Sequence, residues 1–143
     1  MAIVYVNIGS NLGQREKLIE TTIDKIAEVF GYYCTSEFVE SEPWGFESTN
    51  SFLNIGMAFK TDLEPESVLD RLQEIERQVS EVAHRDSTGH YKDREIDIDI
   101  MAIDTLLYDS SRLSLPHKYL YERDFFLRPL NQLWPEGNYP RLR

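Results

Sequence analysis

Two aspartates, Asp97 and Asp99, alternate with isoleucines in residues 94–101. Successive side chains of a β-strand point to opposite faces, so this pattern predicts a strand with the isoleucines on one face and both carboxylates on the other. Side chains two residues apart along a strand lie roughly 6.5–7 Å apart. Two carboxylates at this separation could hold one or two divalent ions, and Mg²⁺ is usually held by one or two carboxylates together with phosphates and water. Arg94 directly precedes them, with a planar guanidinium that suits phosphate.

The same pattern also fits the solvated face of an amphipathic strand. Such a face usually mixes Thr, Lys and Glu, whereas aspartate is depleted in strands. The local pattern therefore leaves the metal site and the solvated face equally open. The other elements of the chain have to decide between them.

The composition indicates one folded domain. The chain has 143 residues, of which 41% are hydrophobic and 12% aromatic, enough for a two-layer core. The net charge of −10 argues against general nucleic-acid binding but not against a nucleotide triphosphate held by a metal and a few arginines. A single cysteine, Cys34, excludes an intrachain disulfide and suits a reducing compartment.

Membrane attachment and secretion are not expected. Residues 1–6 have neither a basic region nor a cleavage site, and no run approaches the ~20 apolar residues of a membrane span. We therefore expect a soluble cytoplasmic protein with no nucleic-acid or membrane partner. The acidic surface is compatible with a monomer.

Apolar periodicity predicts a ferredoxin-like α+β fold. Strands are expected at residues 2–8, 32–40, 52–60 and 94–101, and helices at residues 14–30 and 65–79. Gly31 is placed to end the first helix in the left-handed conformation. The order strand, helix, strand, strand, helix, strand predicts the βαββαβ arrangement, with an antiparallel sheet and both helices on one face.

The remaining segments are expected to be loops and extra C-terminal elements on the other face of the sheet, where a substrate could also bind. They are a polar loop of lid-like length at residues 80–93, a short edge excursion at 106–113, a helix at 122–133 broken at Pro129, and an irregular tail at 134–143. No domain boundary is visible, so residues 1–143 are expected to form a single domain.

Two loops allow more than one interpretation. Residues 9–13 have glycines at both ends and could cradle an anion before a helix, but a tight strand-to-helix turn fits better because no Gly-Lys-Ser/Thr follows. Residues 41–51 include Trp44 and Phe46, which either pack on the core or meet a ligand. Packing on the core is the commoner outcome for such aromatics.

Five stretches, supported by residues 123–130, follow the order and spacing of one known family. They are Ile8-Gly9-Ser10-Asn11-Leu12-Gly13, Ser41-Glu42-Pro43-Trp44-Gly45, Phe52-Leu53-Asn54, Arg94-Glu95-Ile96-Asp97-Ile98-Asp99-Ile100 and Leu115-Pro116-His117. Together they resemble the 6-hydroxymethyl-7,8-dihydropterin pyrophosphokinase family of folate synthesis, over almost the whole chain. The resemblance implies the fold predicted above. It also implies transfer of pyrophosphate from ATP to the hydroxymethyl oxygen of the pterin, with release of AMP.

The resemblance also implies roles for particular residues. The catalytic set would be Asp97, Asp99, Arg94 and His117, with two Mg²⁺ ions on Asp97 and Asp99. The ATP-binding set would be Gln73, Glu76, Arg85, Arg94, Ile100, Arg112, Ser114, His117 and Arg123. The pterin-binding set would be Ser41, Glu42, Trp44, Phe52, Asn54, Tyr91 and Phe125, with Phe52 and Phe125 stacking on the ring and Asn54 meeting its hydrogen-bonding edge.

One stretch departs from the family pattern. After the second helix the family shows Gly-Arg-x-Arg, whereas this chain has Ser-Glu-Val-Ala-His-Arg at residues 80–85. Glu81 stands where the first arginine belongs, although Arg85 or Lys92 could compensate. Two hypotheses follow: an active pyrophosphokinase with an altered loop, and a catalytically impaired relative that binds pterin or nucleotide without turnover. A third is an interaction module of the same fold that binds no ligand.

Overall fold

The computed structural model describes residues 1–11, 13–42, 51–83 and 96–134. Its elements are β1 (Ala2–Ser10), α1 (Arg15–Phe30), β2 (Tyr33–Thr35), β3 (Val39–Ser41), β4 (Phe52–Thr61), α2 (Pro65–Ala83), β5 (Asp97–Ile103), β6 (Tyr108–Asp109), β7 (Ser114–Leu115) and α3 (Asp124–Leu133). This order confirms the predicted succession of strands and helices.

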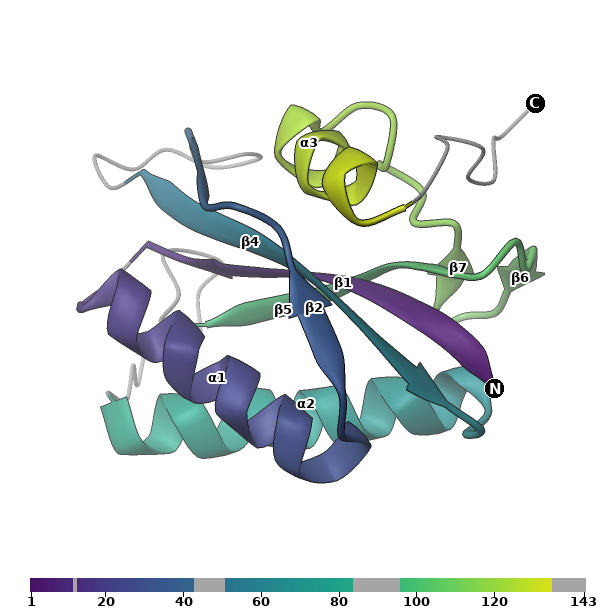
Figure 1. The fold of residues 1–143 in the computed structure, drawn as a ribbon, viewed down its shortest axis with the longest axis horizontal. Coiled ribbons are helices and arrows are strands. Elements are labelled where there is room, and N and C mark those ends of the chain that lie inside the picture. The colour runs from purple at the N-terminus through teal and green to yellow at the C-terminus, as the bar shows by residue number, and fades with distance from the viewer. Residues whose placement is uncertain (12, 43–50, 84–95, 135–143) are drawn as a thin grey trace.

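The main sheet has the antiparallel order β2–β4–β1–β5, and β3 pairs with the same strand as β2. Strand β1 is therefore central, and β5, which carries the two aspartates, is an edge strand. Helices α1 and α2 lie below the sheet in Figure 1, and α3 lies above it. This arrangement confirms the predicted ferredoxin-like fold, with additional C-terminal elements on the second face.

The face under α1 and α2 carries the larger core. Alternate residues of β1, β4 and β5 point to this side and meet the apolar stripes of the two helices, as predicted. The buried members include Val4, Val6, Ile8, Ile19, Ile23, Ile26, Ile55, Met57, Phe59, Val68, Leu72, Ile75, Val79, Ile96, Ile98 and Ile100. Gly31 ends α1 with φ of 89°, and its N–H donates to Ala27 O at 2.8 Å.

The opposite face is covered by α3, which packs on Tyr5, Ala58 and Met101. Helix α3 is amphipathic, and its Phe126 and Leu130 are fully buried there. The predicted break at Pro129 is wrong, because the helix continues to Leu133 with Pro129 inside it. Pro129 is buried against Gly56 of β4, and this packing against the sheet offsets the backbone hydrogen bond that proline cannot donate.

The predicted second strand is also corrected, because residues 32–40 form two short strands. Ser36 lies between β2 and β3 and faces Gly56: its N–H donates to Gly56 O at 2.9 Å, and its Oγ accepts from Gly56 N–H at 2.8 Å. A side-chain oxygen thus replaces a backbone carbonyl in the ladder. This local irregularity lets both short strands pair with β4.

Two predicted boundaries also move. Gly9 and Ser10 belong to β1 rather than to a turn, because they pair with Asn54 and Leu53 of β4. Helix α2 reaches Ala83, so the first four residues of the predicted loop at 80–93 are helical. The rest of that loop lies outside the described residues, as does the tail after Trp134.

Strand β5 is followed by the β6–β7 hairpin, which accounts for the predicted excursion at residues 106–113. The ladder between β1 and β5 shifts between Tyr5 and Val6, so Met101 is an extra residue in β5. After β7 the chain returns across the sheet, and His117 N–H donates to Met101 O at 2.9 Å. In the parts of the chain that the structure describes, no helix combines the length and hydrophobicity needed to cross a membrane.

Candidate functional site

Two rows of residues across the sheet bring the predicted site residues together. The register aligns Asn54 of β4 and Asp97 of β5 with Gly9 of β1, which lies between them. The next row aligns Gly56 and Asp99 with Asn7. All of these positions point to the face covered by α3, because their alternate neighbours are in the core under α1 and α2. Predicted nucleotide and pterin residues therefore share one face, a few strand widths apart.

A cavity of about 400 Å³ opens beside the edge strand β5, between α2 and the β6–β7 hairpin. Its lining includes most of the described residues that the resemblance assigned to ATP. These are Gln73, Glu76, Ile100, Arg112, Ser114 and His117, and the two predicted metal ligands, Asp97 and Asp99, also line the cavity. Residues from three separate parts of the sequence thus meet at a single cavity large enough for a small ligand.

Asp97 and Asp99 lie on one face of β5 and are partly exposed, as the alternation predicted. Within the described residues, no group of three or more His, Cys, Asp or Glu side chains is arranged to hold a metal ion. Two carboxylates on a partly open face are nevertheless a donor set that suits Mg²⁺, which takes its other ligands from phosphates and water. The donor chemistry therefore fits magnesium bound together with a polyphosphate.

His117 is oriented towards Asp99 by a backbone contact. Its Nδ1 accepts the N–H of Tyr119 at 3.1 Å, so in the neutral ring the proton is on Nε2. Nε2 lies 3.8 Å from Asp99 Oδ1. The ring of His117 also packs nearly perpendicular to that of Phe126, with centroids 5.0 Å apart. This arrangement presents an N–H donor beside the two carboxylates, which an anionic phosphate oxygen could accept.

Glu76 of α2 binds the free edge of β5. Its Oε2 accepts the N–H of Ile98 at 2.6 Å, so the backbone of Ile98 faces away from β1. Alternate residues of a strand direct their backbone groups to the same side, so the backbone of Ile100 also faces outward. The edge of β5 that borders the cavity therefore has backbone N–H and C=O groups facing outward, and the N–H of Ile98 among them is bonded to Glu76.

Arg112 lies at the mouth of the cavity in a network with α2. Its guanidinium contacts Asp70 at 2.5 Å, Glu66 at 3.4 Å and Gln73 at 3.4 Å. The hydrogen bond with Asp70 raises the pKa of Arg112 above its ordinary value. Tyr108 also donates a hydrogen bond to Glu66. Arg112 is thus held near the cavity by carboxylates, and a phosphate would have to compete with them for it.

Arg123 lies apart from the cavity lining, over a cluster of aromatic rings. Its guanidinium carbon is 5.0 Å from the ring centroid of Tyr119, 5.7 Å from that of Phe125 and 4.9 Å from that of Phe126. Stacking of this kind fixes the position of the guanidinium plane. The structure therefore places Arg123 next to Phe125 and outside the lining of the cavity beside β5.

A second group of predicted residues surrounds Gly9. Asn54 is 1% exposed, and its Nδ2 donates to Val39 O at 3.1 Å and to Ser41 Oγ at 2.8 Å. A Cβ atom at Gly9 would lie 3.0 Å from Asn54 Oδ1 and 3.5 Å from Phe52 Cδ1. The absence of a side chain at Gly9 therefore leaves space on the sheet between Asn54 and Phe52 on one side and Asp97 on the other, and we call this surface the floor at Gly9. Both amide hydrogens of Asn54 are used by β3, so its Oδ1 is the atom that faces Gly9.

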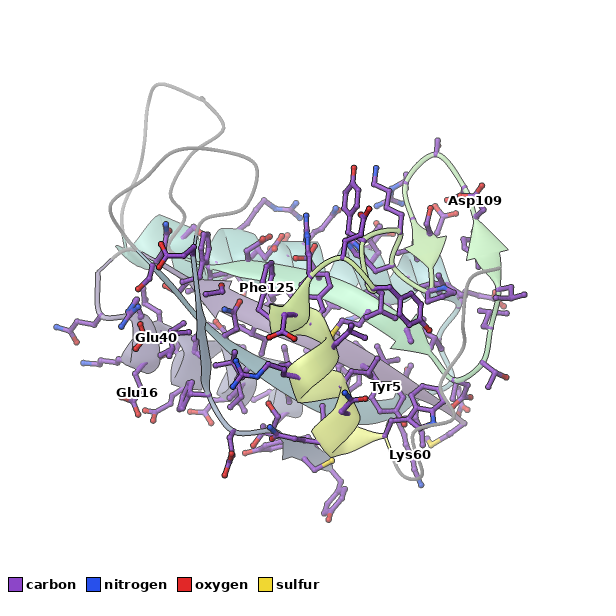
Figure 2. The ribbon with its side chains drawn as sticks, turned by 90° about the horizontal axis from the view of Figure 1, so that it is seen from above. Tyr5, Glu16, Glu40, Lys60, Asp109 and Phe125 are labelled. Atoms are coloured by element: carbon purple, nitrogen blue, oxygen red, sulfur yellow. The ribbon has the colours of Figure 1, made fainter. Side chains whose placement is uncertain are left out.

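Phe125 is the first-turn aromatic residue of α3 and is partly exposed. Figure 2 shows it at the beginning of α3, over the sheet and well away from Asp109 on the hairpin. Its ring packs edge-on against Phe126, with centroids 5.1 Å apart. Glu42, next to Ser41, is exposed. The predicted pterin residues that can be located therefore come from β3, β4 and the start of α3.

Four predicted site residues lie outside the described residues: Trp44, Arg85, Tyr91 and Arg94. Conversely, the sequence analysis missed Lys118 and Ser110, which line the cavity, and Asn7, which contacts Asn54. A basic residue directly after His117 was a visible signal for Lys118. No local pattern pointed to Asn7, because its partner is 47 residues away.

Comparison with known proteins assigns these features to one family. The family model described as 7,8-dihydro-6-hydroxymethylpterin-pyrophosphokinase matches residues 5–135. A 2-amino-4-hydroxy-6-hydroxymethyldihydropteridine pyrophosphokinase of Porphyromonas gingivalis is 40% identical over 148 residues, covering 99% of this chain and all of that protein. The enzyme of the same name from Aquifex aeolicus is 36% identical over 143 residues, covering this whole chain and 87% of that protein.

A solved structure supports the fold independently. The structure described as Plasmodium falciparum HPPK-DHPS superposes with a TM-score of 0.71 at 17% identity, covering 99% of this chain and 43% of that one. The folic acid synthesis protein FOL1 of Dictyostelium discoideum is 33% identical over 140 residues, which are 98% of this chain and 21% of that protein. This chain therefore resembles one portion of these longer proteins.

Proposed function

The chain belongs to the 7,8-dihydro-6-hydroxymethylpterin-pyrophosphokinase family, and from this we propose how its two groups of site residues divide the substrates. The family's reaction is the transfer of pyrophosphate from ATP to the hydroxymethyl group of 6-hydroxymethyl-7,8-dihydropterin, with release of AMP, in folate biosynthesis. We assign ATP to the cavity beside β5 and the pterin to the floor at Gly9. The observation that carries this assignment is the row Asn54–Gly9–Asp97.

The row supports the assignment because substrates bound at its two ends would be within reach of each other. Adjacent strands are about 4.8 Å apart, so Asn54 and Asp97 are separated by roughly 10 Å across Gly9. A flat pterin held at Asn54 and between Phe52 and Phe125 spans most of that distance. Its hydroxymethyl group would then end close to Asp97, where the β-phosphate of ATP would lie.

In the reaction, the hydroxymethyl oxygen forms a bond to the β-phosphorus of ATP. The bond from that phosphorus to the oxygen bridging the α-phosphate breaks, and AMP leaves with the bonding electrons. The proton of the hydroxyl passes to a base, and Asp97 is the carboxylate in line with the pterin row. Such a transfer requires mainly in-line positioning and neutralisation of charge.

Asp97 and Asp99 would hold Mg²⁺, for which we propose two ions bound with ATP. The metal would neutralise negative charge on the phosphates when bound. His117 donates from Nε2 to a phosphate oxygen, and Arg112 and Lys118 add positive charge at the mouth of the cavity. Glu76 and the outward backbone of Ile100 border the adenosine, with Gln73 and Ser114 beside them. Arg123, fixed on its aromatic cluster, would reach the phosphates from the pterin side.

The remaining assignments extend the same proposal. Ser41, Glu42 and Trp44 would close the pterin pocket on the β3 side, and Tyr91 on the other. Arg85 and Arg94 would contribute further phosphate contacts in place of the altered Gly-Arg-x-Arg stretch. We also propose that residues 1–143 act as a single domain, as a monomer, in the cytoplasm.

A coupled assay for AMP formation from ATP, Mg²⁺ and the hydroxymethyl pterin tests the proposal. We expect the Asp97→Ala, Asp99→Ala double variant to lose at least about 100-fold in rate, because charge stabilisation at the phosphates is usually the largest catalytic contribution. The control is the Asp24→Ala, Asp62→Ala double variant, which removes the same charge from two exposed positions outside the site. Equal rates in the two double variants would contradict the assignment. Tight pterin binding by the wild type without AMP formation would favour the catalytically impaired relative.

A further inference from the structure

Asn7 is a buried carboxamide at the centre of the sheet to which the proposed reaction gives no role. It is 2% exposed and lies between Asp99 on β5 and Gly56 on β4. Its Nδ2 donates to Asn54 Oδ1 at 3.2 Å. Its own Oδ1 is buried and has no hydrogen-bond partner among the residues that the structure describes.

The hydrogen bonds of Asn54 determine which way both amides point. Nδ2 of Asn54 has two acceptors on β3, at Val39 O and Ser41 Oγ, so its Oδ1 must face β1. Oδ1 can only accept, so the group that meets it from β1 has to be a donor. This requirement turns the NH₂ of Asn7 towards Asn54 and leaves the carbonyl oxygen of Asn7 without a donor.

Stability alone does not explain an asparagine at this position. A buried carbonyl without a hydrogen bond destabilises the fold. An apolar side chain at position 7 would remove that carbonyl but would also remove the donor to Asn54 Oδ1, so one buried acceptor would be unpaired in either case and stability does not favour asparagine. The hydrogen bond that Asn7 donates is directed at a residue of the pterin pocket. Asn7 therefore combines an unpaired carbonyl oxygen, which costs stability, with an N–H donor that bonds to a residue of the proposed pterin site.

We propose that Asn7 is a positioning residue that fixes the carboxamide of Asn54 as an acceptor for the pterin. This inference rests on the proposed function, in which Asn54 meets the hydrogen-bonding edge of the ring. With both N–H groups committed to β3 and one lone pair to Asn7, Asn54 offers its ligand the remaining lone pair of Oδ1. The pocket therefore selects an edge that carries N–H donors, as the aminopyrimidinone edge of a pterin does.

Calorimetry with the purified protein tests this role by comparing dissociation constants for the hydroxymethyl pterin and for a non-hydrolysable ATP analogue with Mg²⁺. Asn7→Leu removes both the donor and the unpaired carbonyl while keeping the same branched side-chain skeleton. We expect its melting temperature to stay close to that of the wild type, because one unpaired buried acceptor replaces another, while the pterin Kd rises about three- to tenfold, the effect of one lost hydrogen bond. The Kd of the ATP analogue should stay within about twofold, because no group of the cavity is altered.

Asn7→Asp places an oxygen against Asn54 Oδ1, so pterin binding should weaken by more than about tenfold.

Two further variants separate positioning from a general structural effect. Thr22→Val removes another buried polar group, whose Oγ1 donates to Leu18 O within α1 at 2.8 Å, and should leave the pterin Kd unchanged. In an Asn54→Ala background, Asn7→Leu should have no additional effect on the pterin Kd, because there is no amide left to orient.

An unchanged pterin Kd in Asn7→Leu would overturn the inference while leaving the proposed function standing. An equal loss of pterin and nucleotide affinity, or an undiminished effect in the Asn54→Ala background, would also overturn it. A wild-type protein that does not bind the pterin would instead refute the proposed function, and this inference with it.

Discussion

Replacing Gly56 by alanine tests whether the packing of α3 on the sheet sets the affinity for the pterin. A Cβ atom at Gly56 would lie 2.7 Å from Pro129 Cβ and 2.9 Å from Leu133 Cδ1. Carbon atoms in van der Waals contact are about 3.5–4.0 Å apart, so α3 has to move away from β4 by roughly 1 Å. The proline ring has no rotamer to change, so the displacement falls on the helix as a whole.

The expected magnitudes follow from this overlap. Overpacking of this kind costs about 1–3 kcal/mol, which for a domain of this size lowers the melting temperature by roughly 3–12 °C. Phe125 lies one turn before Pro129 and moves with α3, whereas no residue of α3 lines the cavity beside β5. Misplacement by 1 Å can reduce a rate by up to ~100-fold. We therefore expect the pterin Kd to rise about tenfold or more, with the affinity for the ATP analogue within about twofold.

Calorimetry and steady-state AMP formation, well below the melting temperature, provide the measurement. Gly31→Ala is the matched control: its Cβ would have open space, but its φ of 89° strains any side chain. That variant should lose stability without losing pterin affinity. Wild-type pterin affinity in Gly56→Ala, or an equal loss in Gly31→Ala, would refute the argument that α3 positions Phe125.

Three further predictions concern single side chains. Phe125→Ala should weaken pterin binding by about 10- to 100-fold, the value of one lost stacking contact, with much less effect on nucleotide; calorimetry would show equal losses if the variant were merely misfolded. The hydrogen bond from Tyr108 and the charge of Arg112 lower the pKa of Glu66 from its ordinary 4.5. The ionised Glu66 therefore stabilises the fold above pH 4.5, and this stabilisation is lost as the pH falls through the lower pKa of the folded state. Thermal melts between about pH 3 and 6 should therefore show a shallower acid decline for Glu66→Gln than for the wild type, and parallel curves would contradict this. Lys118→Gln should raise the KM for MgATP about three- to tenfold, less so at high salt, whereas Lys60→Gln, on an exposed site of β4, should not change it.

Local periodicity was sufficient to predict most of the fold. The alternation around Asp97 and the apolar stripe of α2 each repeat with the period of one type of element, so each could be recognised from residues close in sequence. The features that were predicted wrongly depend on partners elsewhere in the fold. Ser36 divides the second strand because it bonds to Gly56, and Pro129 remains helical because it packs on that same glycine. Neither the contact of Ser36 with Gly56 nor that of Pro129 with Gly56 can be recognised from the neighbouring residues in the sequence.

The site divides in the same way. Residue types suggested a metal site at Asp97 and Asp99 without excluding a solvated strand face. The family resemblance suggested their neighbours, most of which the structure gathers at one cavity. The hydrogen bond between Asn7 and Asn54 could not be foreseen, because two asparagines 47 residues apart have no detectable relation in a single sequence. It depends on the register between β1 and β4, which only the assembled sheet defines.

Strand β1 lies in the middle of the sheet, with Asn54 on one neighbouring strand and Asp97 on the other. In the proposed assignment, the backbone ladder therefore sets the distance between the two substrates. That distance depends on the interstrand spacing of about 4.8 Å, which side-chain substitutions scarcely alter. Changes in the surrounding loops can therefore tune how tightly each substrate is held without altering how far apart they are held. A slip of register, or an insertion within β1, β4 or β5, would change the distance between the two bound substrates.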